Sequence, residues 1–232
     1  MKDFTFYNPT RIEFGKGKEN NIGQYMNEYG CKKVLIVYGS ERIKRNGLFD
    51  RVSASLNENG IEFVEVGGVV SNPLLSKVNE AIDVAKEKNV DSLLAIGGGS
   101  VLDSVKAIAA GAKYDGDVWD FFVGKAAVQE ALPLFSIMTL AATGSEMNMF
   151  GVVTNDETKE KPAIMSPFLF PKVSVVNPEL QATVTKDYLA YSAVDIFAHC
   201  LDLYFSAAYL PEINQALIEN ILRTVKKTTE LL

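Results

Sequence analysis

The chain has 232 residues, of which 47% are hydrophobic and 22% charged, and this composition is that of an ordinary globular protein. A net charge of -6, with Lys and Arg scattered along the chain, argues against a nucleic acid partner. The sequence has no apolar run of the ~20 residues that span a bilayer, and no signal or transit sequence is recognisable. We therefore expect a cytoplasmic protein with no membrane partner. Cys31 and Cys200 lie far apart, which argues against a disulfide framework or a thiolate metal site.

Hydrophobic patterning predicts strands that alternate with helices over most of the chain. Two short strands are predicted at 4–7 and 11–14, then an amphipathic segment at 22–29. Strands follow at 33–38, 61–66, 90–96, 134–138, 152–154 and 173–176, with helices at 48–59 and 74–88 and a loop or short turn at 119–122. This alternation predicts an α/β fold with a parallel sheet. Beyond Pro178 the pattern is helical, so we expect an α/β domain at 1–179 and an incomplete helical domain at 180–232.

Three glycines interrupt the chain where the strand at 90–96 ends. Gly97, Gly98 and Gly99 carry no Cβ, so a ligand can approach the backbone closely there. Ser100 follows as the expected helix cap, and the helix start presents free N–H groups to one point. That arrangement suits a pyrophosphate, and a plain tight turn is the structural alternative.

Two further loops follow predicted strands, at the sheet edge where parallel sheets bind ligands. Gly39 and Ser40 would lie beside an adenosine ribose, and Arg42 and Lys44 close behind them favour NADP, although Glu41 could instead face the sugar of NAD. The loop at 139–148 combines small hydroxylated residues around a glycine. It predicts either a second ligand-facing loop or a turn that caps the next segment.

A cluster of polar residues recurs on one face of the apolar helical segment at 187–204. Asp195, His199 and Asp202 stand at i, i+4 and i+7, and His199 is the single histidine of the chain. A carboxylate and an imidazole four residues apart can reach one divalent cation. The alternative is a histidine that simply pairs with its neighbouring aspartate.

Five motifs together resemble the iron-containing alcohol dehydrogenase family, in particular its butanol dehydrogenase and broad aldehyde reductase branch. They are IGGGSVLDSVK at 96–106, MTLAATGSEMN at 138–148, Lys161-Pro162, VVNPEL at 175–180 and YSAVDIFAHCLDLYF at 191–205. The resemblance implies a dinucleotide-binding α/β domain followed by a helical metal-binding domain, with the active site in the cleft between them. It also implies hydride transfer between NADP or NAD and a primary alcohol or aldehyde, in an enzyme that needs iron or zinc as a Lewis acid.

The resemblance assigns roles to individual positions. The implied cofactor contacts are Gly39, Ser40, Gly98, Gly99, Ser100, Asp103, Thr139, Thr143, Asn148 and Lys161, beside Gly97 of the same glycine loop. Asp195 and His199 resemble the first two metal ligands. No side chain is an obvious general base, so no catalytic residue is assigned.

The sequence departs from the family pattern in its histidines. The family completes its metal site with two further histidines in a longer chain, and this chain has no second histidine. Since a catalytic metal normally has three protein ligands, we expect a truncated family member. The alternative to an active enzyme is a non-catalytic dinucleotide-binding chain that associates with another subunit through the apolar helix face at 211–232. A homo-oligomer, a dimer, is expected in either case. Another polyol or phosphosugar enzyme on a similar fold is disfavoured by the ATGSEMN stretch.

Overall fold

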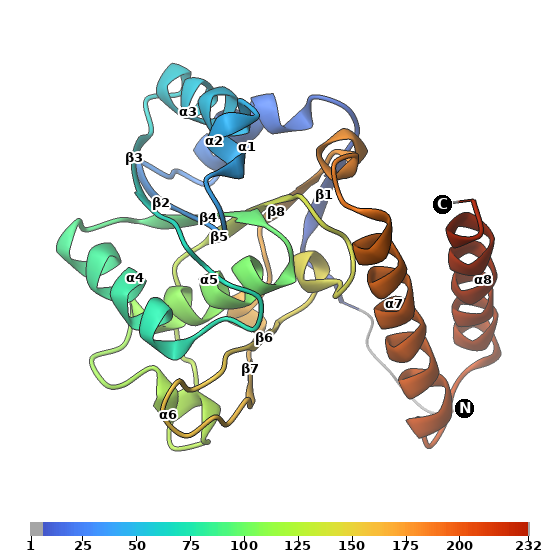
Figure 1. Ribbon diagram of the computed structural model, residues 1–232. Coiled ribbons are helices and arrows are strands. Elements are labelled where there is room, and N and C mark those ends of the chain that lie inside the picture. The colour runs from blue at the N-terminus through green and yellow to red at the C-terminus, as the bar shows by residue number, and fades with distance from the viewer. Residues whose placement is uncertain (1–6, 232) are drawn as a thin grey trace.

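The computed structural model describes residues 7–231, and within them six strands form one parallel sheet (Figure 1). The order across the sheet is β1-β8-β5-β4-β2-β3. The strands are β1 (Arg11–Phe14), β2 (Lys33–Tyr38), β3 (Glu62–Val66), β4 (Ser92–Gly97), β5 (Leu134–Met138) and β8 (Val173–Val176). The predicted α/β fold with a parallel sheet is therefore confirmed.

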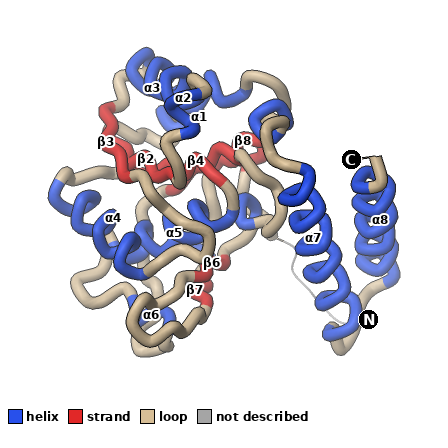
Figure 2. The backbone as a smooth tube through the Cα atoms, viewed as in Figure 1, coloured by secondary structure: helices blue, strands red, loops and turns tan. Residues whose placement is uncertain are grey.

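Helices cover both faces of the sheet, and Figure 2 shows the strands as a band between two helical layers. One face carries α1 (Ile22–Asn27), α2 (Arg42–Arg45) and α3 (Leu48–Glu58), and the other carries α4 (Leu75–Glu87), α5 (Gly99–Gly111) and α6 (Trp119–Phe122). Along β2, Val34 and Ile36 join the core cluster that contains α3, whereas Leu35 and Val37 join the cluster that contains α4 and α5. Because both faces of the strand are buried, its sequence is apolar throughout.

A small antiparallel hairpin of β6 (Phe150–Val152) and β7 (Ala163–Met165) packs against α5. A Cβ on Gly151 would lie 3.1 Å from the carbonyl oxygen of Asp103, so the glycine permits this close approach. The strand predicted at 152–154 is displaced, since Val152 ends β6 and Thr154 pairs with Leu74 in an isolated bridge. The sequence pattern does not predict β7, because three residues are too few to show a period.

Other local expectations differ from the structure in detail. Ser100 does not cap α5: Gly98 is the residue before the helix, and Ser100 lies within its first turn. Residues 119–122 form the short helix α6 rather than a loop. The strand predicted at 4–7 lies outside the described residues except for Tyr7, which belongs to no strand. Short 3-10 helices lie at η1 (Lys18–Asn21), η2 (Ser145–Met147), η3 (Pro167–Leu169) and η4 (Pro178–Gln181).

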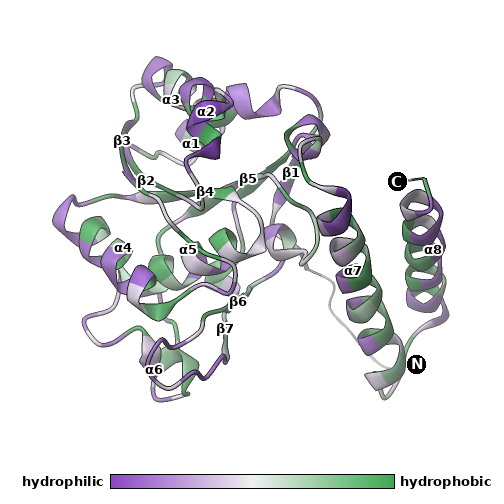
Figure 3. Ribbon diagram, in the orientation of Figure 1, coloured by the Kyte–Doolittle hydropathy of each residue, from purple (hydrophilic) through white to green (hydrophobic). Residues whose placement is uncertain are grey.

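The segment beyond residue 180 forms two long helices, α7 (Lys186–Ser206) and α8 (Glu212–Thr229), which run side by side and away from the sheet (Figure 1). Of the described side chains in these helices, only Ser192, Ala193 and Ile218 are buried. Hydrophobic residues nevertheless line both helices (Figure 3). A division into domains at 179/180 stays a prediction. In the described part of the chain, no helix has the length and apolar character needed to cross a membrane.

Candidate functional site

The glycine loop joins β4 to α5 at the carboxyl edge of the sheet. A Cβ on Gly97 would lie 2.4 Å from Cγ2 of Val101, and one on Gly99 would lie 2.5 Å from Oγ1 of Thr143. Packing alone therefore disfavours any larger residue at these two positions. None of the described side chains caps α5, so its first backbone N–H groups remain available to a ligand. The helix dipole adds a partial positive charge at the same place.

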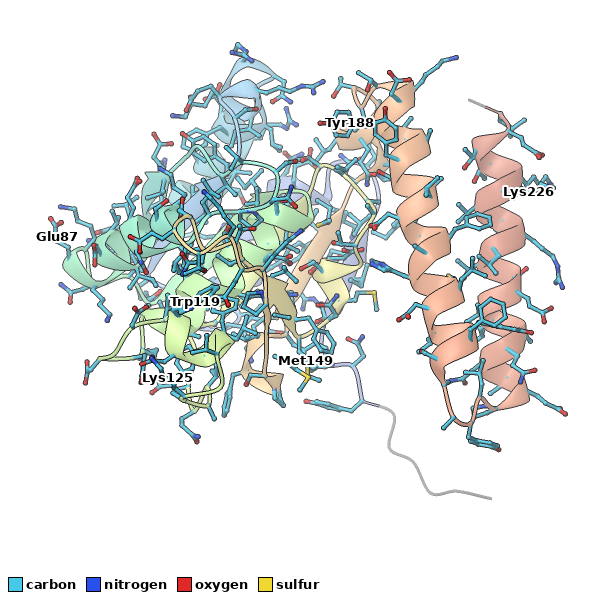
Figure 4. All side chains as sticks on the ribbon, turned by 60° about the horizontal axis from the view of Figure 1, so that its bottom comes forward. Glu87, Trp119, Lys125, Met149, Tyr188 and Lys226 are labelled. Atoms are coloured by element: carbon cyan, nitrogen blue, oxygen red, sulfur yellow. The ribbon has the colours of Figure 1, made fainter. Side chains whose placement is uncertain are left out.

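A first cavity of about 340 Å³, here called the glycine-loop cavity, lies beyond the ends of β2, β4 and β5. Among the residues predicted to bind cofactor, it is lined by Gly39, Ser40, Gly97, Gly98 and Thr139. Its far wall comes from the segment that leads into α7, including Thr183 and Tyr188, whose side chain stands at the start of that helix (Figure 4). The sequence did not predict this wall, because nothing local places 183–188 opposite the loops.

A second cavity of about 570 Å³, here called the polar cavity, lies on the other side of the α5 N-terminus. The predicted site residues that line it are Ser100, Asp103, Thr143, Asn148, Lys161, Asp195 and His199. Gly99 lines neither cavity and instead lies against Thr143. The structure thus brings predicted site residues that are up to 99 positions apart, Ser100 and His199, to the wall of one cavity.

The loop at 139–148 forms the expected turn and also lines both cavities, and its role in binding a ligand stays a prediction. Thr143 Oγ1 accepts a hydrogen bond from Ser145 N–H at 3.2 Å, which makes the expected turn before η2. Residues of the same loop also face the cavities, with Thr139 in the glycine-loop cavity and Thr143 and Asn148 in the polar cavity. The turn and the ligand-facing role are therefore compatible.

A buried network holds this loop against α5. Ser145 Oγ donates to Asp103 Oδ1 at 2.8 Å and accepts from Lys106 Nζ, also at 2.8 Å. Burial raises the pKa of the Asp103 carboxyl, against the Ser145 hydrogen bond and the charge of Lys106, which lower it. Burial lowers the pKa of Lys106 to about 8, and the negative charges of Asp103 and Glu146 oppose this shift.

Lys106 is the residue at this site that the sequence motifs did not identify. Its side chain is fully buried. The sequence signal that could have found it is a lysine three residues after Asp103, directly before the apolar run at 107–110. Such a charge must find partners in the interior.

The predicted metal ligands lie on α7, at the polar cavity. Asp195 Oδ1 and His199 Nε2 are 3.8 Å apart, and their side chains are 41% and 58% exposed. Within residues 7–231 there is no group of three or more His, Cys, Asp or Glu side chains that could hold a metal ion. The two predicted ligands alone are fewer than a catalytic metal site normally has.

The basic residues behind β2 already have partners inside the protein. Arg42 Nη2 donates to the carbonyl oxygen of Thr183 at 2.8 Å. Lys44 Nζ lies 2.8 Å from Glu65 Oε1 and 3.3 Å from Glu41 Oε2. Lys44 is therefore partly neutralised by acidic neighbours, whereas the partner of Arg42 is an uncharged carbonyl group.

A parallel sheet with a glycine loop at the start of a helix, and a cavity on either side of that helix start, is an arrangement typical of dinucleotide-binding α/β proteins. Residues 9–178 match the model of the iron-containing alcohol dehydrogenase family, and the chain belongs to that family. The resemblance stated from the sequence motifs is thereby confirmed.

Several known proteins are similar to this chain over nearly its whole length. The probable NADH-dependent butanol dehydrogenase 1 of Bacillus subtilis is 46% identical over 98% of this chain, and the NADPH-dependent aldehyde reductase of Escherichia coli is 34% identical over 97%. The crystal structure of NADH-dependent butanol dehydrogenase A from Thermotoga maritima superposes with a TM-score of 0.97 at 49% identity and covers 100% of this chain. The chain covers 59%, 58% and 58% of these three relatives, respectively.

Proposed function

We propose that this chain binds NADH across the α5 N-terminus and serves hydride transfer between that cofactor and an aldehyde or primary alcohol of the butanal and butanol type. The observation that carries the proposal is the pair of cavities that adjoin one uncapped helix start, with Gly98 lining one and Ser100 the other. The adenosine half would occupy the glycine-loop cavity beside Gly39 and Ser40. The pyrophosphate would meet the N–H groups of α5, and the nicotinamide would enter the polar cavity.

The choice of NADH over NADPH rests on the charges behind β2. The Tyr38 hydroxyl donates to Glu41 at 2.9 Å and lowers the pKa of that carboxyl, so Glu41 stays ionised. Lys44 is held between Glu41 and Glu65, so a 2′-phosphate would meet two carboxylates beside it. Arg42, which lines the glycine-loop cavity, already donates to the carbonyl oxygen of Thr183. Relatives at 44–46% identity are also named as NADH-dependent, whereas the aldehyde reductase at 34% identity is named as NADPH-dependent.

The polar cavity supplies donors where the substrate oxygen would gain charge. NADH would supply a hydride to the carbonyl carbon when bound, and the carbonyl oxygen would take up a proton from solvent. Lys161 lines the cavity and is held by a 2.7 Å hydrogen bond from its Nζ to Asn72 Oδ1, so its positive charge is fixed near the site. A fixed cation beside a developing alkoxide lowers the barrier.

Asp195 and His199 are proposed as two ligands of a divalent metal, iron or zinc, which would polarise the substrate oxygen when bound. The described residues do not complete the metal site.

The test is a titration of the 232-residue chain with NADH and with NADPH, with and without Fe²⁺ or Zn²⁺, combined with an assay of butanal reduction. Gly98→Val should abolish NADH binding with little change in circular dichroism, because its new Cβ faces Leu140 at 3.2 Å inside the glycine-loop cavity. Gly116→Val is the matched control, since its Cβ would meet the far end of the Tyr114 side chain, which lines neither cavity.

Each outcome of that titration has a distinct meaning. Turnover that depends on metal would support the oxidoreductase. NADH binding without turnover would favour the non-catalytic dinucleotide-binding chain, for which the exposed apolar side chains of α7 and α8 offer a surface for another subunit. NADH binding by Gly98→Val equal to that of the unmodified chain would contradict the cofactor assignment.

A further inference from the structure

Lys106 occupies an unusual position for a lysine, two turns along α5 and with no exposed surface. Its Nζ lies within hydrogen-bond distance of four acceptors: Ser145 O, Ser145 Oγ and Asn148 Oδ1, each at 2.8 Å, and Phe150 O at 2.6 Å. An ammonium group has three protons to donate and accepts none. Every partner of Lys106 must therefore present an oxygen to it.

This requirement fixes the orientation of the Asn148 amide. Asn148 Oδ1 accepts from Lys106 Nζ at 2.8 Å and from the backbone N–H of Phe150 at 2.9 Å. Since both neighbours can only donate, the oxygen of the amide must face them, and a flipped amide would set N–H groups against N–H groups. The Nδ2 group of Asn148 is therefore turned away from Lys106.

Asn148 lines the polar cavity, and no hydrogen bond from its Nδ2 is found among residues 7–231. Asn148 Nδ2 is thus a hydrogen-bond donor at the cavity wall, and the contacts of Oδ1 with Lys106 and Phe150 fix its direction. We propose that Lys106 is a positioning residue that locks the Asn148 amide so that Nδ2 donates to an acceptor oxygen of the bound nicotinamide nucleotide. This inference rests on the proposed binding of NADH.

Replacement of Asn148 by aspartate separates this role from a structural one. Asn148→Asp keeps the oxygen that Lys106 and Phe150 N–H require, and it adds an ion pair to Lys106, so the fold should be retained. The donor that faces the cavity becomes a second oxygen, which repels an acceptor of the ligand. We expect NADH binding about tenfold weaker, with thermal stability equal to or above that of the unmodified chain.

Asn57→Asp, on the exposed surface of α3, is the matched control for the added negative charge. It should leave NADH affinity unchanged. If Asn148→Asp binds NADH as tightly as the unmodified chain, the inference is overturned. If the unmodified chain binds no NADH, the proposed function itself fails, so the two failures are distinguishable.

A double-mutant cycle tests whether Lys106 acts through Asn148. Lys106→Met and Asn148→Ala should each weaken NADH binding, and the double variant should bind no more weakly than Asn148→Ala alone. Losses that simply add would mean that Lys106 affects the cofactor independently of Asn148 and would contradict the proposal. If Lys106→Met fails to fold, as judged by circular dichroism, the aspartate variant still decides the question.

Discussion

The α/β part of the molecule and the α7–α8 pair differ sharply in how their apolar residues are used. In β4 every residue is buried, whereas in α7 and α8 large apolar side chains such as Tyr191, Val194 and Leu203 are 65%, 67% and 53% exposed. Figure 3 shows hydrophobic residues in both regions, so composition does not explain the difference. What differs is the number of packing neighbours that the described chain provides.

This contrast also divides the candidate site. Asp103 and Asn148 stand on a wall braced by the buried Lys106, with contacts of 2.6 to 2.8 Å. Asp195 and His199 face them from an exposed helix and are 3.8 Å apart. Since a site is only as precise as the elements that carry it, the cofactor half is held more rigidly than the metal half.

The largest expected effect is a difference in stability between two identical substitutions. Leu102→Ala, in the fully buried face of α5, should lower the free energy of unfolding by about 2–5 kcal/mol. Leu203→Ala, which is 53% exposed on α7, should change it by no more than about 0.5 kcal/mol. Urea denaturation of both variants measures the difference. A comparable loss in Leu203→Ala would show that this face of α7 is covered in solution, for example by a second copy of the chain.

The same contrast explains how much of the fold could be predicted from the sequence. The strands and helices of the α/β part follow closely from their patterns, and β2 has the predicted bounds, because a parallel strand buried on both faces must be apolar throughout. The predicted start of α5 was wrong, because Ser100 was expected to be its N-cap and Gly98 holds that position. A serine after glycines is a usual N-cap, but here the close packing of Gly97 and Gly99 fixes the turn.

Tertiary relations set the limit of the sequence analysis. The sequence predicted seven of the twelve residues that line the polar cavity but five of the sixteen that line the glycine-loop cavity. Which residues share a cavity depends on chain crossings that no local pattern encodes. The same holds for Lys106, whose four acceptors come from 145–150, about forty residues away. Arg42 and Lys44 carry the charge that the NADP interpretation used, but the sequence does not show that Glu65 and Thr183 already bind them.

The next effect is a pH dependence of the free energy of unfolding, and it tests the contribution of the buried Lys106 to the α/β part. The pKa of Lys106 is 10.5 in an unfolded chain and about 8 in the folded one, because burial disfavours its charge. Between these values the unfolded state binds more protons, so stability should rise with pH by up to about 3 kcal/mol from this group. Below about pH 8 both states are protonated and the contribution is flat.

Comparison of two variants isolates that contribution. The free energy of unfolding, measured by urea denaturation, should be higher at pH 10 than at pH 7.5 in the unmodified chain. This rise should be absent in Lys106→Met and kept in Lys125→Met, since the Lys125 side chain is 73% exposed. Asp103 and Glu146 face Lys106, and their negative charges oppose the lowering of its pKa. An equal pH dependence in all three proteins would show that Lys106 does not titrate in this window.

The smallest expected effect lies behind β2, where the choice between the two cofactors is proposed. Replacing both Glu41 and Glu65 by glutamine removes two negative charges and frees Lys44, so NADPH affinity should rise about fivefold, which corresponds to an exposed ion pair of about 1 kcal/mol. NADH affinity should change less than about twofold, since NADH lacks the 2′-phosphate.

Glu62→Gln is the control, because Glu62 carries the same charge at the other end of β3, where it pairs with Lys33 at 3.6 Å. It should alter neither affinity. Fluorescence titration with both cofactors gives the ratio directly, and the gain should shrink as salt is added, because exposed charges are screened. An equal gain for NADH and NADPH would mean that the carboxylates repel the pyrophosphate that both cofactors share. The discrimination would then have to come from shape at Gly39 and Ser40 rather than from charge.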